Sequence, residues 1–484
     1  MKNETYTSIQ NVDVAVIGGG TAGFAAAVAA ARNGAKTLLI ERYDCLGGTL
    51  TGGLVGVIIS EFRMHKGRKS IYPKETNFEG EQTIKGIANE LANRLICSGG
   101  AYGEKDRIPV SVCTNTEALK QMMDEMCVES GVNLWFGSTF LEANHEGGRL
   151  NSITVQNKSG RHMIKAKVFI DSSGDGDVSE KSGIPFVMGR EPDGVTMPVS
   201  LLFTTGGVKL DETIAYLQKK PTELSWPPIE SIIENYKSGK PFSIFAFRER
   251  LVSAYSMGDL PMAYGAENPI PLFAIHSVIR GGQVLQDRTA HIVDMAYQIH
   301  ATDSKDYSKA CIEVRKRIPI IISFLKKYIP GYQNCFLDQA ASQLGVRETR
   351  RFLCKYTLTS DDITAAKEFD DAIAVNGGNM NLHSETGGKL MENYGGQKYK
   401  PVSKPYQIPL RCLIPNEINN LIIAGKTISC DRLALGSLRW SPVCIAIGQG
   451  AGTAAAIAVK SDVPVSEISL SELRQTLLEQ EVLL

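Results

Sequence analysis

The sequence has no excess charge of either sign, because 52 lysines and arginines balance 52 aspartates and glutamates over 484 residues. A neutral total argues against nucleic acid or an anionic membrane surface as the main partner. The ten cysteines are scattered and form no Cys-x-x-Cys pair, so neither a zinc ribbon nor an iron–sulfur cluster is indicated. We therefore expect no bound metal and no nucleic-acid partner.

Long apolar runs are also lacking. The first ten residues, MKNETYTSIQ, are polar and contain no run of the signal-peptide type. The longest run of small residues, around Ala25–Ala31, consists of alanine more than leucine and falls short of a membrane span. We therefore expect a cytoplasmic protein without a membrane partner, and the length predicts two or three domains.

The first forty residues predict a dinucleotide-binding unit. Val12–Ile17 (VDVAVI) is typical of a short buried strand, and an alanine-rich helix is expected from Thr21 to Arg32. A second strand, Lys36–Ile40, follows and leads into the acidic residue Glu41. Strand, turn, helix and strand in this order predict an α/β fold with a Rossmann-like domain.

The glycines in the turn between that strand and helix each have a physical reason. Gly18, Gly20 and Gly23 fit the pattern G-x-G-x-x-G. Gly18 permits the tight turn, Gly20 lets the backbone approach a pyrophosphate, and Gly23 lets helix and sheet pack closely. The helix N-terminus offers free N–H groups to the phosphates, and Glu41 can accept hydrogen bonds from ribose hydroxyls.

The residues after Glu41 favour FAD over NAD. Arg42–Gly53 (RYDCLGGTLTGG) holds two glycine pairs at a place where a nicotinamide-binding unit would continue into another helix and strand. This stretch resembles the FAD-dependent oxidoreductases of the two-domain type that includes the fumarate reductase flavoprotein. In that family, glycines at this place lie along the flavin part of the cofactor.

Later segments extend the resemblance. DSSGDGD (Asp171–Asp177) is similar to the turn with which the family returns to the dinucleotide, although Ser-Ser-Gly stands where relatives often have Ala-Thr-Gly. NLIIAG (Asn420–Gly425) is similar to the last strand of the family, but Lys426 follows where many relatives have a cofactor-binding Asp, and Asp431 is a weak candidate to replace it. The run Pro330–Asp362 resembles a subgroup known only as FAD-dependent oxidoreductases.

The resemblance also implies the mode of attachment and the contacts of the cofactor. No histidine lies between Gly47 and Gly53, where some fumarate reductase relatives attach FAD covalently, so we predict noncovalent FAD. A thioether from Cys45 is the alternative. The implied cofactor-binding residues are Gly18, Gly20, Thr21, Ala22, Gly23, Glu41, Arg42, Gly47, Gly48, Thr49, Thr51, Gly52, Gly53, Ser173, Gly174, Gly425 and Gly448.

The last predicted helix begins with Ser441 as N-cap and Pro442 at the first helical position. Gly448 and Gly452 share one face of it and leave room for close approach. If the N-terminus of this helix points at the flavin, its dipole would stabilise the anionic reduced ring. A tightly packed core helix is the plainer interpretation, and both can hold.

Two further absences narrow the chemistry. The chain has no second G-x-G-x-x-G between a strand and a helix, so a dedicated NAD(P)H domain is not expected. Cys45 has no second cysteine a few residues further on, so a redox disulfide beside the flavin is not expected either.

His383 is the histidine best placed for proton transfer. It lies in VNGGNMNLHSETGG (Val375–Gly388), which is typical of an irregular loop, and functional side chains are common in loops. Relatives in the subgroup often have Asp-x-His here, whereas this chain has Asn-Leu-His. We predict a site residue, with a surface-loop histidine as the alternative.

GVRETRRFLCKY (Gly345–Tyr356) concentrates charge on a predicted strand. Its alternation places Glu348 and Arg350 on the apolar face, while Arg347 faces the other way. Buried charges are costly unless paired. Two interpretations follow: a buried Glu348–Arg350 pair between the domains, or a clamp in which a guanidinium binds a substrate carboxylate.

Arg439, in SLRW just before the last helix, is a second candidate for binding an anion, with a phosphate or backbone contact as the alternative. We expect the glycine-rich loop, the charged strand and SLRW to converge at the flavin. The predicted catalytic residues are His383, Arg350, Arg347 and Arg439.

The cofactor segments are far apart in sequence, so the FAD-binding domain must be discontinuous. We assign it to residues 1–196 and 410–484, and an inserted α+β substrate domain to residues 197–409, with residues 60–110 as a further candidate part of the insert. Within the insert, Asp303–Tyr328 is predicted to be a helix. The substrate is expected between the two domains.

The favoured function is hydride transfer between FAD and a small organic substrate, which is anionic if an arginine clamp forms. Two alternatives stay open: a flavin monooxygenase that uses external NAD(P)H, and an FAD-binding protein without catalysis. The sequence names neither the substrate nor the external electron donor or acceptor.

Overall fold

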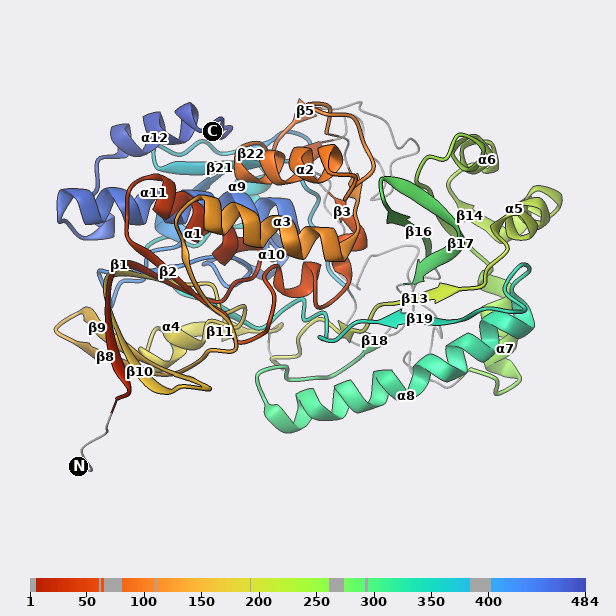
Figure 1. Cartoon of the computed structure of the whole chain (residues 1–484), viewed down its shortest axis with the longest axis horizontal. Coiled ribbons are helices and arrows are strands. Elements are labelled where there is room, and N and C mark those ends of the chain that lie inside the picture. Colours follow the sequence, from red (N-terminus) through yellow and green to blue (C-terminus); the bar gives the residue numbers. More distant parts are fainter. Residues whose placement is uncertain are drawn as a thin grey trace.

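The computed structural model describes residues 6–60, 62–64, 81–108, 111–191, 193–260, 274–291, 295–383 and 402–484. The described chain forms two lobes, each with its own sheet and its own apolar core (Figure 1). The predicted α/β class, with a Rossmann-like domain and a second domain, is confirmed by this arrangement.

The first lobe is built on a mostly parallel sheet. Its strands are β1 (Ser8–Ile17), β2 (Thr37–Ile40), β7 (Asn133–Trp135), β8 (Thr139–Glu146), β9 (Arg149–Asn157), β10 (Gly160–Asp171) and β23 (Leu421–Ile423). They lie in the order β7-β2-β1-β10-β9-β8, with β23 beside the end of β10. Ile17 lies opposite both Ile40 and Asp171, so these parallel strands end at one edge, where sheets of this kind bind ligands.

Two helices rich in small residues pack on this sheet: α1 (Thr21–Arg32), whose bounds agree with the prediction, and α11 (Ser441–Ser461). A Cβ on Gly448 would lie 2.1 Å from the carbonyl oxygen of Ala22, so only glycine permits this approach. A Cβ on Gly452 would likewise lie 2.1 Å from the carbonyl oxygen of Ala26. The predicted close approach is confirmed, and its partner is α1.

Two expectations about α11 were wrong. Its N-cap is Trp440, not Ser441, and no side chain caps the helix. The helix is also long and apolar enough to cross a membrane by length and composition, contrary to the expectation that no segment would be. In the folded chain, 94% of the apolar stretch of this helix is buried inside the protein, because the helix lies in the core of the first lobe.

The second lobe holds a six-stranded antiparallel sheet in the order β14-β15-β16-β17-β13-β19. The strands are β13 (Phe203–Gly206), β14 (Leu224–Trp226), β15 (Ser243–Ala246), β16 (Ala274–Arg280), β17 (Gln283–His291) and β19 (Phe336–Ala340). The helices are α5 (Leu210–Lys219), α6 (Ile229–Lys237), α7 (Arg248–Ser256) and α8 (Ser304–Tyr328). Asp303, the first residue of the predicted helix, is the N-cap of α8 and accepts hydrogen bonds from the N–H groups of Lys305 and Asp306.

The remaining described elements are short or flank the two sheets. The helices are α2 (Ile87–Cys97), α3 (Thr116–Glu129), α4 (Asp177–Lys181), α9 (Ser360–Thr364), α10 (Arg432–Leu438) and α12 (Leu470–Glu479). The 3-10 turns are η1 (Gly48–Leu50), η2 (Val55–Val57), η3 (Pro221–Glu223), η5 (Leu410–Cys412) and η6 (Val465–Glu467). The paired strands are β3 (Ile58–Ser60) with β6 (Ser111–Cys113), β4 (Arg63–Met64) with β5 (Glu81–Gln82), β11 (Phe186–Met188) with β20 (Arg350–Phe352), β12 (Val199–Ser200) with β18 (Met295–Ala296), and β21 (Ala372–Asn376) with β22 (Tyr406–Pro409).

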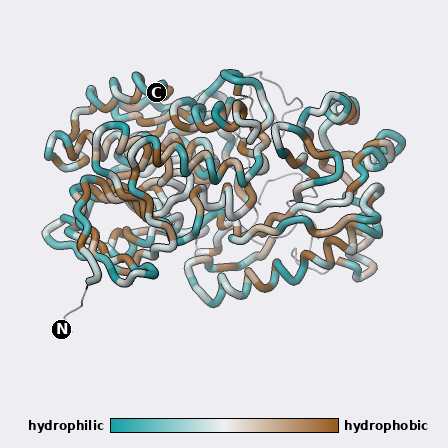
Figure 2. Tube along the Cα trace, in the orientation of Figure 1, coloured by the Kyte–Doolittle hydropathy of each residue, from teal (hydrophilic) through white to brown (hydrophobic). Residues whose placement is uncertain are grey.

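The two cores divide the chain at other places than the predicted boundaries. The second core runs from Val199 to Leu344, with Leu54 from the first lobe added to it. Buried apolar residues between Leu358 and Ile408, such as Ile373, pack in the first core, so the chain returns well before residue 409. Most of the described buried apolar residues within 60–110 also pack in the first core. Figure 2 shows the apolar residues gathered in the sheet and central helices, while apolar and polar residues alternate along α8.

The contact between α1 and α11 generates a stability prediction. Gly448→Val places side-chain atoms against the backbone of α1, and overpacking of this kind costs about 1–3 kcal/mol or more. We expect a lower denaturant midpoint by urea unfolding, together with loss of bound cofactor. Lys460→Ala, at the exposed end of the same helix, is the control and should change the midpoint little. Equal midpoints for Gly448→Val and the wild type would contradict the packing account.

Candidate dinucleotide and anion site

The turn after β1 is shaped for close approach of a ligand. Gly18 has φ +96°, and a Cβ there would lie 2.3 Å from the carbonyl oxygen of Ser172. A Cβ on Gly23 would lie 1.8 Å from the carbonyl oxygen of Gly18. A Cβ on Gly20, in contrast, would meet no atom within 4 Å, so the turn presents open space at this residue. Two glycines therefore serve packing, and the open space at Gly20 is what the predicted approach of a pyrophosphate requires.

The N-terminus of α1 is free to bind an anion. Its N-cap is Gly20, which has no side chain to cap the helix, and no acidic residue lies in the first turn. The hydroxyl of Ser172, buried beside Gly23, has no hydrogen-bond partner. Open space, free backbone N–H groups and a buried hydroxyl without a partner fit a dinucleotide at this edge.

Glu41, the residue predicted to bind the ribose, organises the turn. Its Oε2 accepts from the N–H of Gly19 at 2.5 Å, and its Oε1 accepts from the N–H of Tyr43 at 2.8 Å. Burial raises the pKa of Glu41, against these two hydrogen bonds, which lower it. Each carboxylate oxygen keeps a second lone pair with which it can accept a ribose hydroxyl. Arg42 is exposed beside it and lies over the ring of Tyr43.

The glycine-rich loop Gly47–Gly53, which we call the flavin loop, folds back on the turn. The N–H of Gly47 donates to the carbonyl of Gly19 at 2.8 Å. Thr51, a predicted cofactor contact, is buried, and its hydroxyl donates to the carbonyl of Leu46 at 2.5 Å, so this side chain closes the loop. Thr49, by contrast, is exposed.

The flavin loop is also tied to the chain that leaves the second lobe. The carbonyl of Gly52 accepts from the N–H groups of Ser342 and Gln343 at 2.9 and 3.0 Å. A Cβ on Gly52 would lie 2.5 Å from the side-chain nitrogen of Gln343. The flavin loop and the segment around Ser342 and Gln343 therefore hold each other in place. Arg347 follows this segment by a few residues.

The segment after β10 forms a tight polar turn. The hydroxyl of Ser173 donates to Asp171 at 2.7 Å and accepts from the N–H of Asp177 at 2.8 Å, so it supports the turn itself. Gly174, with φ +86°, has open space where a Cβ would lie. A Cβ on Gly425, which has φ +102°, would lie 3.4 Å from the Cβ of Ala22 at the start of α1.

Lys426, which stands where many relatives have Asp, binds protein groups. Its Nζ donates to the carbonyl of Gly174, to Asp175 at 3.1 Å and to the hydroxyl of Thr349 at 3.1 Å. Burial acts to raise the pKa of Asp175, but Lys426 and Arg42 outweigh it and hold that pKa below its usual value. Asp431, the candidate replacement, instead caps α10 through the N–H of Ala434 at 2.7 Å.

The N-termini of α1 and α11 meet. Cys444, in the first turn of α11, is buried, and its side chain interacts with that of Thr21 at the start of α1. Burial raises the pKa of the Cys444 thiol to about 12, so it stays protonated. Gly448, a predicted cofactor contact, lies one turn further along α11 and packs against the backbone of Ala22. Both helix N-termini thus point to the same region, and neither carries a side-chain cap.

The predicted pairing of Glu348 with Arg350 was wrong, because only Arg350–Phe352 of the charged segment is a strand. Because the strand does not begin at residue 345, Glu348 and Arg350 do not share a strand face, and Glu348 binds other residues. Its carboxylate binds Arg351 at 2.6 Å and Arg432 at 3.0 Å, and accepts the N–H of Met197 at 2.8 Å. All three charged side chains are buried.

Arg350 is a structural contact rather than part of this cluster. Its guanidinium donates to the carbonyl of Asp175 at 2.9 Å and to Asp177 at 3.3 Å, and it lies over the ring of Phe186. These partners occupy it at the turn after β10, so the substrate clamp predicted for Arg350 finds no support.

Arg347, Arg439 and His383 lie near one another, and we call this cluster of three side chains the recess. Arg439 donates to the carbonyl of Asn381 at 3.0 Å, two residues before His383, and Arg347 donates to the carbonyl of Pro198 at 2.8 Å. Burial and the charge of Arg347 lower the pKa of Arg439 to about 9. Burial lowers the pKa of Arg347 to about 10. All three side chains retain some exposed surface.

The electrostatics of the recess are unbalanced. Burial, Arg347 and Arg439 together hold the pKa of His383 well below its ordinary value, so its imidazole is neutral at physiological pH. Within the described residues, neither Arg347 nor Arg439 has a carboxylate at ion-pair distance. The nearby Glu348 is already bound to two other arginines. The charged segment and SLRW thus lie close to each other, while their predicted convergence with the glycine-rich loop at the flavin stays a prediction.

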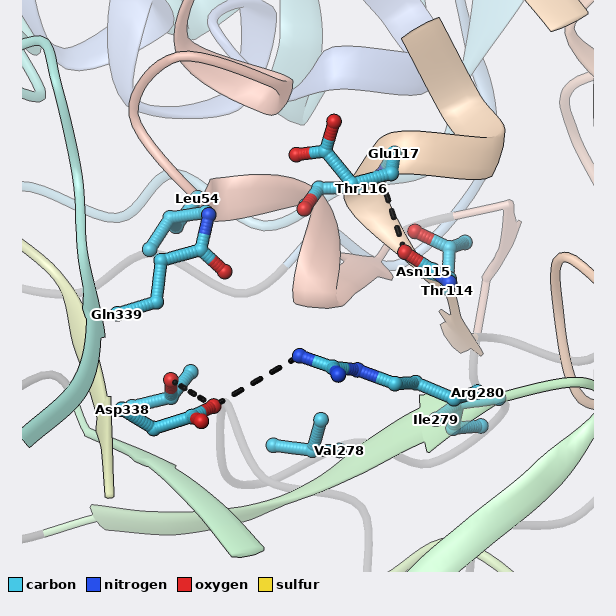
Figure 3. A pocket seen from close by; sticks show the side chains of 11 residues that line it. Leu54, Thr114, Asn115, Thr116, Glu117, Val278, Ile279, Arg280, Asp338 and Gln339 are labelled. Carbon is cyan, nitrogen blue, oxygen red and sulfur yellow. Dashed lines mark hydrogen bonds and ion pairs between the residues drawn. The ribbon is translucent and has the colours of Figure 1, made fainter. Parts of the chain in front are cut away.

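A separate cavity of about 270 Å³ opens between the lobes at the end of the flavin loop (Figure 3). Leu54 and Thr116 line it from the first lobe, and Arg280 and Asp338 line it from the second. Arg280 points across it towards Asp338, at 3.8 Å. This cavity contains neither the two arginines of the recess nor His383.

The family of FAD dependent oxidoreductases matches this chain over residues 13–477. The chain belongs to that family. FAD is accordingly its cofactor, and the open turn, the uncapped N-terminus of α1 and the Ser172 hydroxyl are the features that fit it. No curated protein matches the chain.

Solved structures resemble the fold only distantly. One is a geranylgeranyl bacteriochlorophyll reductase-like protein from Thermoplasma acidophilum, with 14% identity and a TM-score of 0.44 over 98% of this chain and 84% of that one. Another is the p-nitrophenol 4-monooxygenase PnpA from Pseudomonas putida DLL-E4, with 11% identity and a TM-score of 0.42 over 97% and 86%. A third is the myxobacterial chondrochloren halogenase CndH, with 15% identity and a TM-score of 0.38 over 97% and 78%. Such values carry no argument about the reaction, and these neighbours do not single out the fumarate reductase type.

Sequence reasoning missed several residues of the site. Arg432 and Arg351 were not expected to bind Glu348, and Ser172 was passed over in favour of its neighbour. Asn379 gave no signal beyond its place in a glycine-rich loop, and Asn381 was noted only as standing where relatives often have Asp. The remainder of that loop, including Ser384–Gly388 of the quoted run, lies outside the described residues.

The turn generates a prediction with a built-in comparison. Gly20→Val should fold normally, because nothing lies within 4 Å of its Cβ, yet should bind FAD about tenfold or more weakly because the side chain fills the pyrophosphate space. Gly23→Val should lose the fold itself, because its Cβ would lie 1.8 Å from a backbone oxygen. Thermal unfolding of the apoproteins and FAD titration separate the two effects. Wild-type FAD affinity in Gly20→Val would refute the placement.

The Glu348 cluster generates a second prediction. Glu348→Gln leaves two buried guanidiniums without their carboxylate, and breaking such a pair costs about 3–5 kcal/mol in the free energy of unfolding. Urea unfolding is the measurement. The control is Glu129→Gln, whose carboxylate is 53% exposed beside Arg94 and should cost less than about 1 kcal/mol. An equal decrease in the free energy of unfolding for the two variants would show that the buried Glu348 cluster stabilises the fold no more than an exposed ion pair does.

Proposed function

We propose that this FAD-dependent oxidoreductase transfers a hydride between the flavin and a small organic anion bound in the recess. The observation that carries the proposal is the positive charge of Arg347 and Arg439, which have no carboxylate partner among the described residues. Partly buried guanidiniums without a counter-ion attract anions, and a substrate carboxylate would supply the missing charge in a geometry that matches the guanidinium fork.

The contacts around the recess support its place beside the flavin. Arg347 follows shortly after Ser342 and Gln343, which bind the flavin loop at Gly52. Arg439 immediately precedes α11, whose first turn meets the start of α1. An anion held between these two arginines would lie between the flavin loop and the two uncapped helix ends.

Each residue of the recess has a stated task in this proposal. The bound FAD accepts or donates the hydride. Arg347 and Arg439 hold the substrate carboxylate and fix the orientation of the adjacent carbon. His383, neutral because burial and both arginines lower its pKa, accepts the proton of the group that is oxidised at a ring nitrogen, or returns it in the reverse direction.

We further propose that FAD is held noncovalently. No histidine lies between Gly47 and Gly53 to form a covalent bond with the flavin. The Sγ of Cys45, the alternative point of attachment, lies 3.8 Å from the hydroxyl of Thr51, which closes the loop. Denaturing the yellow protein and separating it from small molecules tests this point, because FAD should leave with the soluble fraction.

The function is tested by mixing the FAD-loaded protein with small carboxylates without oxygen and following the visible flavin absorption. Bleaching by a carboxylate, and by no matching neutral alcohol, is the expected result. A flavin that bleaches only with NAD(P)H and then consumes oxygen rapidly would identify a monooxygenase instead. A flavin that no donor or acceptor turns over would identify a binding protein without catalysis.

The recess also generates a prediction about pH. In the wild type, the acid limb of kcat/KM should lie below the ordinary range of histidine, because the pKa of His383 is lowered by burial, Arg347 and Arg439. Arg439→Gln removes one of those charges, raises the pKa of His383 and should therefore move the acid limb to higher pH. Arg439→Lys keeps the charge and is the control: KM should rise, while the acid limb stays in place. An acid limb that does not move in Arg439→Gln would remove His383 from the proposed proton transfer.

A further inference from the structure

The loop before His383 and the residues around Arg439 share a set of polar atoms without partners. Asn379 and Asn381 are only 3% and 6% exposed. The side-chain nitrogen of Asn379 and the side-chain oxygen of Asn381 have no hydrogen-bond partner. The same holds for Nε of Arg439 and Nε1 of Trp440. Natural proteins leave few buried polar groups in this state, so several in one place call for an explanation.

These atoms belong to segments in direct contact. Arg439 donates to the backbone carbonyl of Asn381 at 3.0 Å, and a Cβ on Gly436 would lie 2.7 Å from the backbone N–H of Asn381. Arg439 also lies over the ring of Trp440, with 5.3 Å between the guanidinium carbon and the ring centroid. The segments that carry these unpartnered atoms therefore meet beside Arg439.

The chemistry of the unpartnered atoms is mixed. Arg439, Trp440 and Asn379 offer N–H donors, which suit the oxygens of a carboxylate. The side-chain oxygen of Asn381 is an acceptor, and a carboxylate cannot donate to it. The side-chain oxygen of Asn379 is already used by the N–H of Val402 at 3.1 Å, which fixes the orientation of that amide with its nitrogen free.

We propose that the substrate is a hydroxycarboxylate, with its carboxylate on the arginines of the recess and its hydroxyl donating to the side-chain oxygen of Asn381. This inference rests on the proposed function and names the substrate class of the same site. A hydroxyl on the carbon beside the carboxylate would also stand close to His383, which follows Asn381 by two residues. In the reaction, the hydroxyl turns from Asn381 to His383 and gives its proton to that imidazole. The hydrogen of the adjacent C–H bond leaves as a hydride, which carries both electrons to FAD, and an oxo-acid remains.

The test uses pairs of acids that differ by one hydroxyl. Glycolate is compared with acetate, and lactate with propionate, by titrating the FAD-loaded protein without oxygen and following the visible flavin spectrum. We expect the hydroxylated member of each pair to bind about tenfold or more tightly, or to bleach the flavin where its partner only perturbs the spectrum. Equal affinity within both pairs would overturn the inference and leave the anion site standing. If no acid in either pair perturbs or bleaches the flavin, the proposed function fails along with it.

Asn381→Leu separates the hydroxyl contact from the carboxylate contact. The variant should lose the preference for the hydroxylated acid, while the affinity for acetate changes by less than about threefold, since acetate offers no hydroxyl. Asn381→Ala serves if the larger side chain does not fold, and FAD content reports folding in both. Asn416→Leu, at an exposed position before β23, is the matched control and should keep the wild-type preference. A wild-type preference in a folded Asn381 variant would assign the hydroxyl selectivity elsewhere and refute the role of Asn381.

Discussion

The carboxylate of Glu348 is the interaction on which the arrangement of the two lobes depends. It is fully buried and binds Arg351, Arg432 and the backbone N–H of Met197. Met197 lies just before the chain enters the second lobe, and Glu348 lies just after it leaves, so this contact joins the two ends of the second lobe. An ion cluster in this position costs desolvation, and its partners must therefore stay together once the chain has folded. Arg347 is the residue next to Glu348, so its position in the recess follows from that anchor.

Charge balance links this anchor to the chemistry. The carboxylate of Glu348 binds two arginines directly, Arg351 and Arg432. Two more arginines are near it: Arg347 precedes it in the sequence, and Arg439 is close enough for Glu348 to raise its pKa. The remaining two carry charge that no described protein group neutralises at ion-pair distance. The uncapped helix ends of α1 and α11 add partial positive charge in the same region. Such a region favours anions: the pyrophosphate of FAD, the reduced flavin ring and an anionic substrate.

Local patterns in the sequence predicted the parts of this fold that are themselves local. The bounds of α1, the identity of β2 and the close approach at Gly448 follow from residue spacing and side-chain size. The partners of Glu348 could not be predicted, because the alternation was assumed over a segment in which only three residues form a strand, and Arg432 lies 84 residues away. His383, Arg347 and Arg439 were each singled out by type and surroundings, but only the folded chain brings them together. The early return of the chain to the first core likewise depends on packing that the sequence pattern does not contain.

The most direct test of the central claim is a crystal structure of the FAD-loaded protein. The claim is that the recess and the flavin form one site, with the flavin loop on one side and the N-terminus of α11 on the other. We predict electron density for the flavin ring along Gly47–Gly53, with its reactive edge facing the space between Arg347, Arg439 and His383. A flavin ring that lies away from the recess, separated from both arginines by folded protein, would contradict the account.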